Sequence, residues 1–279
     1  MVTMRKPSLH RTSLFMAVLL IILNTSCTGG SSTPPDSTLL FRYTGRTGSE
    51  GIWRMNADGS GITQLTDFGW FARYSPDNSK IAFGKPYADG IWVANADGSS
   101  PIQLTDIGAA PDWSPDGSRL AFHTGGTKGA DRYIWIMNAD GSDAHRLSRV
   151  NGSFPVWSPS GGVILFHGEV NNGIWQIYPD GSDEKMLYRD GGYPAWSPGG
   201  EQVAYVNLYD WCIWVMNADG TGQRKLTDHP GSQPVWSPDG LQIAYERVKQ
   251  DHTEIWIIQS DGTDAHLISK TGVQDDWSN

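Results

Sequence analysis

One recurring unit constrains the fold of this chain more than any other feature. An Ile-Trp pair followed by an Asp-Gly pair occurs six times between Ile52 and Gly262. The aspartates of the Asp-Gly pairs follow one another at intervals of about 41 residues, at positions 58, 97, 140, 180, 219 and 261. A repeat of this length is typical of one four-stranded propeller blade. The sequence therefore predicts an all-β fold, a six-bladed β-propeller.

Each unit contains four short runs rich in β-branched and aromatic residues, which are typical of strands. In the clearest copy these runs are 111–114, 119–122, 133–137 and 144–147. The first turn reads Ser-Pro-Asp-Gly (114–117) and the third reads Asn-Ala-Asp-Gly (138–141). Both favour a type I turn followed by a left-handed residue. The other two links of the unit are irregular and differ from copy to copy.

The two kinds of link define two faces of the expected propeller. In an antiparallel blade the turns after the first and third strands share one end, which we call the tight-turn face. The links after the second and fourth strands share the other end, which we call the variable-loop face. Variable loops on a rigid scaffold commonly carry binding residues, so we expect binding on the variable-loop face.

Large aromatic residues recur at fixed places in the unit and are expected to pack between blades. The third run carries Trp53, Trp92, Trp135, Trp175, Trp214 and Trp256. The first run carries Tyr74, Trp113, Trp157, Trp196, Trp236 and Trp277. Trp70 and Trp211 lie outside these slots.

The two ends of the repeat region complement each other. Residues 39–42 match a second run without a first run before it, and residues 275–279 match a first run without a second run after it. We therefore expect the C-terminal strand to pair with the N-terminal strands and close the ring, which removes the open sheet edges.

The amino terminus has the layout of a secretory signal. Arg5, Lys6 and Arg11 precede an apolar run at 14–23, and small residues lead to Cys27. This run is too short to span a bilayer. A cysteine in this place resembles a bacterial lipoprotein signal, although Asn24 stands where leucine is usual; plain secretion and a retained anchor are the alternatives. The expected organisation is a signal peptide (1–26), a lipid-attached cysteine with a Gly/Ser/Pro tether (27–38) and a propeller (39–279).

The charge balance limits the kinds of partner. The chain has a net charge of −9, and removing a leader with three basic residues gives 18 − 30 = −12. An acidic surface argues against nucleic acid and anionic lipid as partners, so membrane contact is expected through the lipid anchor alone. Cys212 is expected to be a small buried residue, and the protein is expected to be a monomer.

The repeat Pro-x-Trp-Ser-Pro-Asp-Gly, followed by Ile-Trp-x-Met-Asn-Ala-Asp-Gly and Leu-Thr, resembles the WD40-like (PD40) repeat of the TolB propeller family. The resemblance covers residues 39–279 and implies the propeller fold. TolB is a periplasmic protein with an additional α/β domain and an outer-membrane lipoprotein partner, but here only a tether precedes the first blade. Similar propellers occur beside hydrolase domains in prolyl oligopeptidases and as whole enzymes in oligogalacturonate lyases.

Motifs of common enzyme chemistry are absent from the sequence: it contains no Gly-x-Ser-x-Gly, His-Glu-x-x-His, P-loop or dinucleotide fingerprint. Each Asn-Ala-Asp-Gly turn supplies one carboxylate, which is too few for a calcium loop. His123 and His167 follow the second run in neighbouring blades and are weak candidates for a metal site. No cofactor is expected.

The candidate binding residues are aromatic and polar side chains of the variable-loop face. They are Trp70, Phe71, Phe154, Tyr193, Tyr209, Trp211, His229, Gln233 and Gln274. Exposed aromatics around a propeller mouth would suit a protein, a peptide or a glycan. Arg73, Asp112 and Asp276 occupy equivalent places in the first run and are expected to form an ion cluster or to line the channel.

The sequence therefore favours a non-enzymatic binding or scaffold lipoprotein of the cell envelope, of the TolB-like propeller type. It would engage a protein or peptide partner through the variable-loop face. The alternative hypothesis is a metal-dependent carbohydrate lyase or another glycan-active propeller enzyme.

Overall fold

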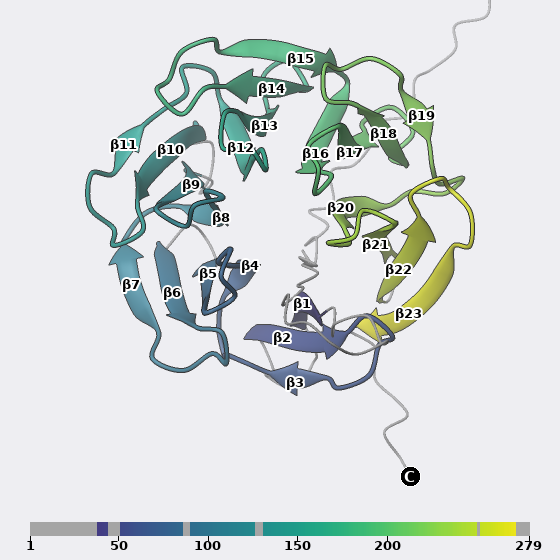
Figure 1. The fold of residues 1–279 in the computed structure, drawn as a ribbon, viewed down its shortest axis with the longest axis horizontal. Coiled ribbons are helices and arrows are strands. Elements are labelled where there is room, and N and C mark those ends of the chain that lie inside the picture. Colours follow the sequence, from purple (N-terminus) through teal and green to yellow (C-terminus); the bar gives the residue numbers. More distant parts are fainter. Residues whose placement is uncertain (1–37, 44–50, 86–89, 126–130, 250–251, 272–279) are drawn as a thin grey trace, which may run out of the picture.

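The computed structural model describes residues 38–43, 51–85, 90–125, 131–249 and 252–271. Within these ranges the chain forms strands and turns without a helix, arranged as six sheets around a central axis (Figure 1). This confirms the all-β, six-bladed propeller. The expected leader, Cys27, the tether up to residue 37, Gln274 and the closing segment 275–279 lie outside the described residues.

Strands take the same radial order in every blade, from the axis outward. The innermost strands are β4 (Trp70–Tyr74), β8 (Ala109–Trp113), β12 (Gly152–Trp157), β16 (Gly191–Trp196) and β20 (Ser232–Trp236). The second strands are β1 (Thr38–Tyr43), β5 (Lys80–Gly84), β9 (Arg119–Thr124), β13 (Ile164–Gly168), β17 (Gln202–Asn207) and β21 (Gln242–Val248).

The outer half of each blade is built by its third and fourth strands. The third strands are β2 (Gly51–Asn56), β6 (Ile91–Asn95), β10 (Tyr133–Asn138), β14 (Gly173–Ile177), β18 (Ile213–Asn217) and β22 (Thr253–Gln259). The outermost strands are β3 (Thr63–Gln64), β7 (Ile102–Thr105), β11 (His145–Arg146), β15 (Lys185–Arg189), β19 (Arg224–Lys225) and β23 (His266–Thr271).

Five blades are four-stranded antiparallel sheets, and blade 1 has three described strands in the order β1-β2-β3. The described residues contain no strand on the axial side of β1, so closure by strand pairing stays a prediction. Side-chain packing nevertheless joins the last blade to the first. Leu39, Phe41 and Met55 of blade 1 form one buried cluster with Val235 and Ile257 of blade 6.

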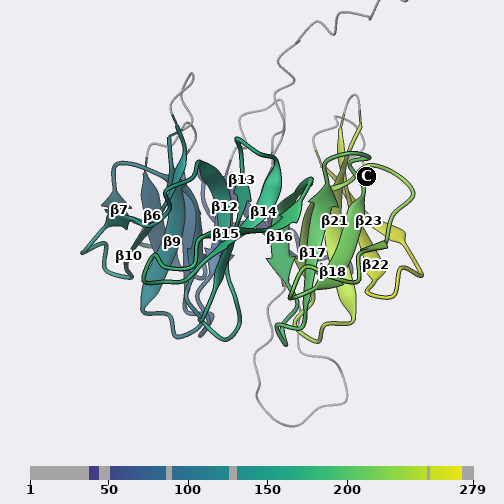
Figure 2. The ribbon, with the colours of Figure 1, turned by 90° about the horizontal axis from the view of Figure 1, so that it is seen from above.

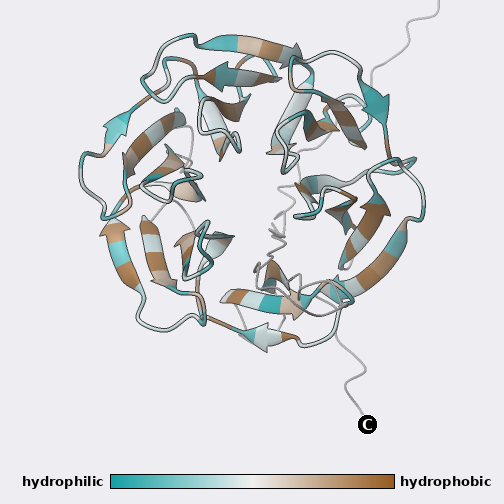
Figure 3. Ribbon diagram, viewed as in Figure 1, coloured by the Kyte–Doolittle hydropathy of each residue, from teal (hydrophilic) through white to brown (hydrophobic). Residues whose placement is uncertain are grey.

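The core consists of six such clusters, one for each contact between neighbouring blades. Figure 3 shows the apolar residues concentrated in the strands, with hydrophilic residues at the turns. The expected packing of tryptophans between blades is observed. Trp113, Trp157 and Trp236 are 6–7% exposed, whereas the tryptophans of the third strands are half-buried at the cluster edges. Cys212 is buried, as expected.

The tight turns form as their sequences predict. In the turn after β8, the Gly117 amide donates to the Ser114 carbonyl (2.8 Å), and Gly117 has a φ of 70°. The Asp116 carboxylate accepts hydrogen bonds from the Ser114 hydroxyl (2.6 Å) and the Ser118 amide (3.0 Å). Asn78 takes the left-handed position in the equivalent turn of blade 2, with a φ of 60°. Seen edge-on, the strands run between the two faces of the ring (Figure 2).

Candidate functional site

A β-bulge interrupts every described innermost strand at the same place, close to the variable-loop face. The pairing register between the innermost strand and the second strand shifts between Trp70 and Arg73 in β4 and between Ser153 and Val156 in β12. The other three innermost strands have the same register shift at the equivalent place. Within each bulge one residue other than glycine has a φ between 48° and 55°. These residues are Phe71, Ala110, Phe154, Tyr193 and Gln233. Left-handed backbone at such residues costs free energy and concentrates at functional sites.

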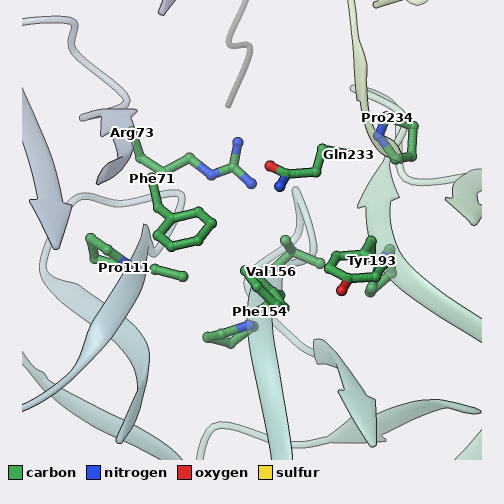
Figure 4. A pocket seen from close by; sticks show the side chains of 11 residues that line it. Phe71, Arg73, Pro111, Phe154, Val156, Tyr193, Gln233 and Pro234 are labelled. Atoms are coloured by element: carbon green, nitrogen blue, oxygen red, sulfur yellow. The ribbon is translucent and has the colours of Figure 1, made fainter. Parts of the chain in front are cut away.

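The bulges bring these five residues together around one axial cavity (Figure 4). The three aromatic residues among them form an aromatic arc together with Trp70, defined here as Trp70, Phe71, Phe154 and Tyr193. Ring centroids lie 6.3 Å apart between Trp70 and Phe71, 5.2 Å between Phe71 and Phe154, and 4.9 Å between Phe154 and Tyr193. Ala110 lies between Phe71 and Phe154 in blade order, and its small side chain lets the two rings meet. Four of the sequence candidates therefore form one cluster, with Gln233 across the cavity.

His123 and His167 pack against two residues of the aromatic arc. Each imidazole packs on the aromatic residue of the next blade, His123 on Phe154 (5.3 Å) and His167 on Tyr193 (5.2 Å). Burial lowers the pKa of His123 to about 3 and also lowers the pKa of His167, so both imidazoles are neutral near pH 7. The described residues contain no group of three His, Cys, Asp or Glu side chains that could hold a metal ion.

The polar side of the axial cavity is formed by Arg73 and Gln233. The Nε of Arg73 lies 3.3 Å from the Asp112 carboxylate, and both side chains are 18% exposed. The other carboxylate oxygen of Asp112 accepts a hydrogen bond from the Trp157 amide (2.8 Å). Burial raises the pKa of Asp112, an effect that Arg73 and the Trp157 amide oppose. Arg73 and Asp112 thus pair and also line the channel.

Two cavities follow one another along the axis. The one lined by Phe71, Phe154 and Tyr193 has a volume of 30 Å³, room for about two water molecules. The second opens towards the tight-turn face, has a volume of 290 Å³, and is lined by Trp157, Trp196, Trp236 and Asp112 among others. Arg73 and Val156 line both cavities, so the two adjoin each other.

Among the described aromatic residues, the most exposed lie on the loop between β17 and β18, on the variable-loop face. Tyr209 is 85% exposed and Trp211 is 46% exposed. The loop is nevertheless held firmly: the Asn207 side chain accepts from the Tyr209 amide (2.9 Å), and the Trp211 amide donates to the Asn207 carbonyl (2.8 Å). Asp210 between them pairs with Lys225 (2.9 Å). Two exposed rings on a preorganised loop suit the recognition of a partner.

Neither Trp70, at the end of the aromatic arc, nor the candidate His229 lines the axial cavity. Trp70 is covered by the Arg42 guanidinium, 3.6 Å from its ring centroid. His229 packs in the outer part of blade 6, with its Nε2 3.2 Å from the Tyr245 hydroxyl and its ring 5.7 Å from Trp256.

Sequence reasoning missed the convergence of Arg73 and Gln233 on one cavity, and it missed the exposed Val170 (73%). The available signal was the shared position of the bulge residue, two places after a glycine in every innermost strand.

The comparisons with known proteins agree with this architecture. No protein-family model matches the sequence. No curated protein matches it either. The solved structures similar in fold include TolB from Acinetobacter baumannii, with a TM-score of 0.75 and 18% identity over 87% of this chain and 66% of that chain. The fold is that of a TolB-like propeller.

Other solved structures show the same fold at similarly low sequence identity. The putative TolB from Agrobacterium tumefaciens has a TM-score of 0.68 and 18% identity, covering 75% of this chain and 84% of that chain. An oligogalacturonate lyase in complex with manganese has a TM-score of 0.59 and 12% identity, covering 90% and 84%. TolB and an oligogalacturonate lyase share this fold, so fold alone does not decide function. Within the described residues, no helix is long and apolar enough to cross a membrane.

Proposed function

We propose that the chain is a non-enzymatic binding or scaffold lipoprotein of the cell envelope, which engages a protein or peptide partner through its variable-loop face. The observation that carries this proposal is the β17–β18 loop. It exposes Tyr209 and Trp211 to solvent while backbone and side-chain hydrogen bonds fix its conformation. Preorganised aromatic side chains are the usual anchors of protein interfaces because they bury large areas at low entropic cost.

The direction of β1 supports the proposed attachment of the chain to the membrane through Cys27. Thr38 pairs with Asn56, the first residue of a tight turn, and Tyr43 pairs with Gly51 at the opposite end. The chain therefore enters the propeller at the tight-turn face. Ten residues lie between Cys27 and Thr38, and the chain from one to the other spans at most about 40 Å when extended. A lipid on Cys27 would hold the tight-turn face towards the membrane and leave the variable-loop face directed away from it, accessible to partners.

Crosslinking capture from intact envelopes tests the proposal. The native protein, a Tyr209→Ala/Trp211→Ala variant and a Tyr178→Ala variant are compared. Tyr178 is the matched control, since it is 39% exposed but begins a turn of the tight-turn face. We expect one protein partner to be recovered with the native chain and with Tyr178→Ala, and to fall at least about tenfold with the double variant.

Equal recovery of that partner with all three proteins would refute the assigned face. Recovery of glycan in place of protein would favour the alternative class of ligand. A Cys27→Ser variant in the same experiment tests the anchor, because it should leave the membrane fraction while its folded propeller still binds the partner.

A further inference from the structure

Among the described residues, the guanidinium of Arg73 is paired along one edge only. Its Nε faces Asp112, and in the described part of the chain this is its one ionic partner. The other end of the guanidinium and the amide of Gln233 point towards one another across the axial cavity (Figure 4). Gln233 is 8% exposed, and its amide has no hydrogen-bond partner among the described residues.

A guanidinium edge and an amide group facing one small space form a donor set suited to a carboxylate. Arginine presents five N–H donors, so an arginine that uses Nε for one carboxylate can hold a second one with its two terminal nitrogens. The amide of Gln233 can donate from the other side. The 30 Å³ cavity between them admits a group of a few atoms.

The adjoining cavity is larger, and its wall carries both apolar and polar side chains. On the other side of Arg73 and Val156 lies the 290 Å³ cavity, where Val235, Trp196 and Trp236 line the wall together with Asp112. A cavity of about 150 Å³ is enough to admit benzene. Apolar walls around a few convergent polar groups are the usual composition of small-ligand sites.

We propose that the axial channel is a binding site for a monocarboxylate with an apolar body, which enters from the tight-turn face. The carboxylate lies between Arg73 and Gln233, and the apolar body fills the cavity beneath Trp236. The ligand is either a free small acid or the carboxy-terminal residue of a peptide. The site uses neither Tyr209 nor Trp211, so it does not depend on the proposed function.

The test uses full-length protein and 3-phenylpropionate, with 3-phenylpropanamide as the uncharged control. The tryptophan indole N–H signals report the location of binding in ¹H–¹⁵N spectra, because Trp157, Trp196 and Trp236 line the cavity. We expect saturable shifts of these three signals with the acid. The amide should bind at least about tenfold more weakly, since hydrogen bonds to charged groups are the strong ones.

Variants separate the role of Arg73 from folding. Arg73→Gln alone would leave Asp112 buried without its partner, so Arg73→Gln/Asp112→Asn is the informative variant. It should retain the native spectrum and lose the preference for the acid. Arg149→Gln, an exposed arginine distant from the channel, should bind as the native protein does.

Equal affinity for acid and amide would overturn the proposal, as would an unchanged preference in the Arg73→Gln/Asp112→Asn variant. Binding seen only after Asp276→Asn would overturn it too, because the terminal nitrogens of Arg73 would then be occupied by the Asp276 carboxylate in the native protein. The peptide Gly-Gly-Phe and its C-terminal amide distinguish the two sources of the carboxylate, a free small acid and the carboxy-terminal residue of a peptide. Tighter binding of the free-acid peptide than of 3-phenylpropionate indicates a peptide terminus, and weaker binding indicates a small acid.

Discussion

Ala110 has a φ of 48° inside β8, a conformation that costs an alanine about 1–2 kcal/mol and costs a glycine almost nothing. We therefore expect Ala110→Gly to raise the free energy of unfolding by about 0.5 kcal/mol, after allowing for the greater freedom of glycine in the unfolded chain. Ala195 is the matched control: it is equally exposed (7%) but is not among the left-handed residues. Ala195→Gly should lower the free energy of unfolding by about 1 kcal/mol.

Chemical denaturation of the two variants beside the native protein measures both changes. Opposite signs are the signature of a left-handed bulge at the axis. If both substitutions destabilise the protein to the same extent, the bulge geometry of the innermost strands is wrong, and with it the arrangement of the aromatic arc.

At the scale of elements, the tight turns make the fold sensitive to acid. Asp77 and Asp116 each accept hydrogen bonds from two serines of their turn, which lower the pKa of each carboxyl to about 2. The aspartates of the six Asp-Gly turns also have lowered pKa values, because of hydrogen bonds from the Ser or Thr two residues later. A carboxyl with a lower pKa in the folded state stabilises the fold above its unfolded pKa of about 4.

This contribution should be present at pH 5–7 and should be lost as the pH falls from about 4 to 2. We expect the Tm to fall steeply over that window. An Asp77→Asn/Asp116→Asn variant should lose about 1 kcal/mol at pH 7, since Asn keeps one acceptor oxygen, and its Tm should fall less steeply with acid. Parallel Tm curves for the variant and the native protein below pH 4 would contradict the role of these turns.

The turns were also the part of each blade that the sequence could specify best. Ser-Pro-Asp-Gly and Asn-Ala-Asp-Gly determine their own hydrogen bonds locally, so both kinds of turn and the register between them could be predicted. The bulges could not, because the left-handed residue is Phe, Ala, Tyr or Gln, and no local preference of these residues favours that conformation. The exposure of Tyr209 and the pairing of Arg73 with Asp112 depend on the distances between blades, which periodicity does not supply.

At the scale of the whole molecule, the remaining question is how the ring is held shut. Blade 6 already packs on blade 1 through Val235, Ile257, Leu39 and Phe41, and the carbonyl of Ile268 in β23 closely approaches Gly59 of blade 1. The described sheet of blade 1 has no innermost strand. Residues 275–279 match the sequence of an innermost strand, and we predict that they supply it.

Deleting residues 275–279 should therefore lower the Tm by at least about 10 °C. One strand contributes several kcal/mol to the free energy of unfolding, and each kcal/mol shifts the Tm of a domain of this size by about 2–4 °C. The matched control is Trp277→Ala, which keeps the backbone pairing but removes the aromatic side chain of the first-run position; it should cost less than the deletion. Thermal unfolding followed by far-ultraviolet circular dichroism measures both. An unchanged melting curve after the deletion would mean that packing between blades 6 and 1 closes the ring without a strand from the C-terminus.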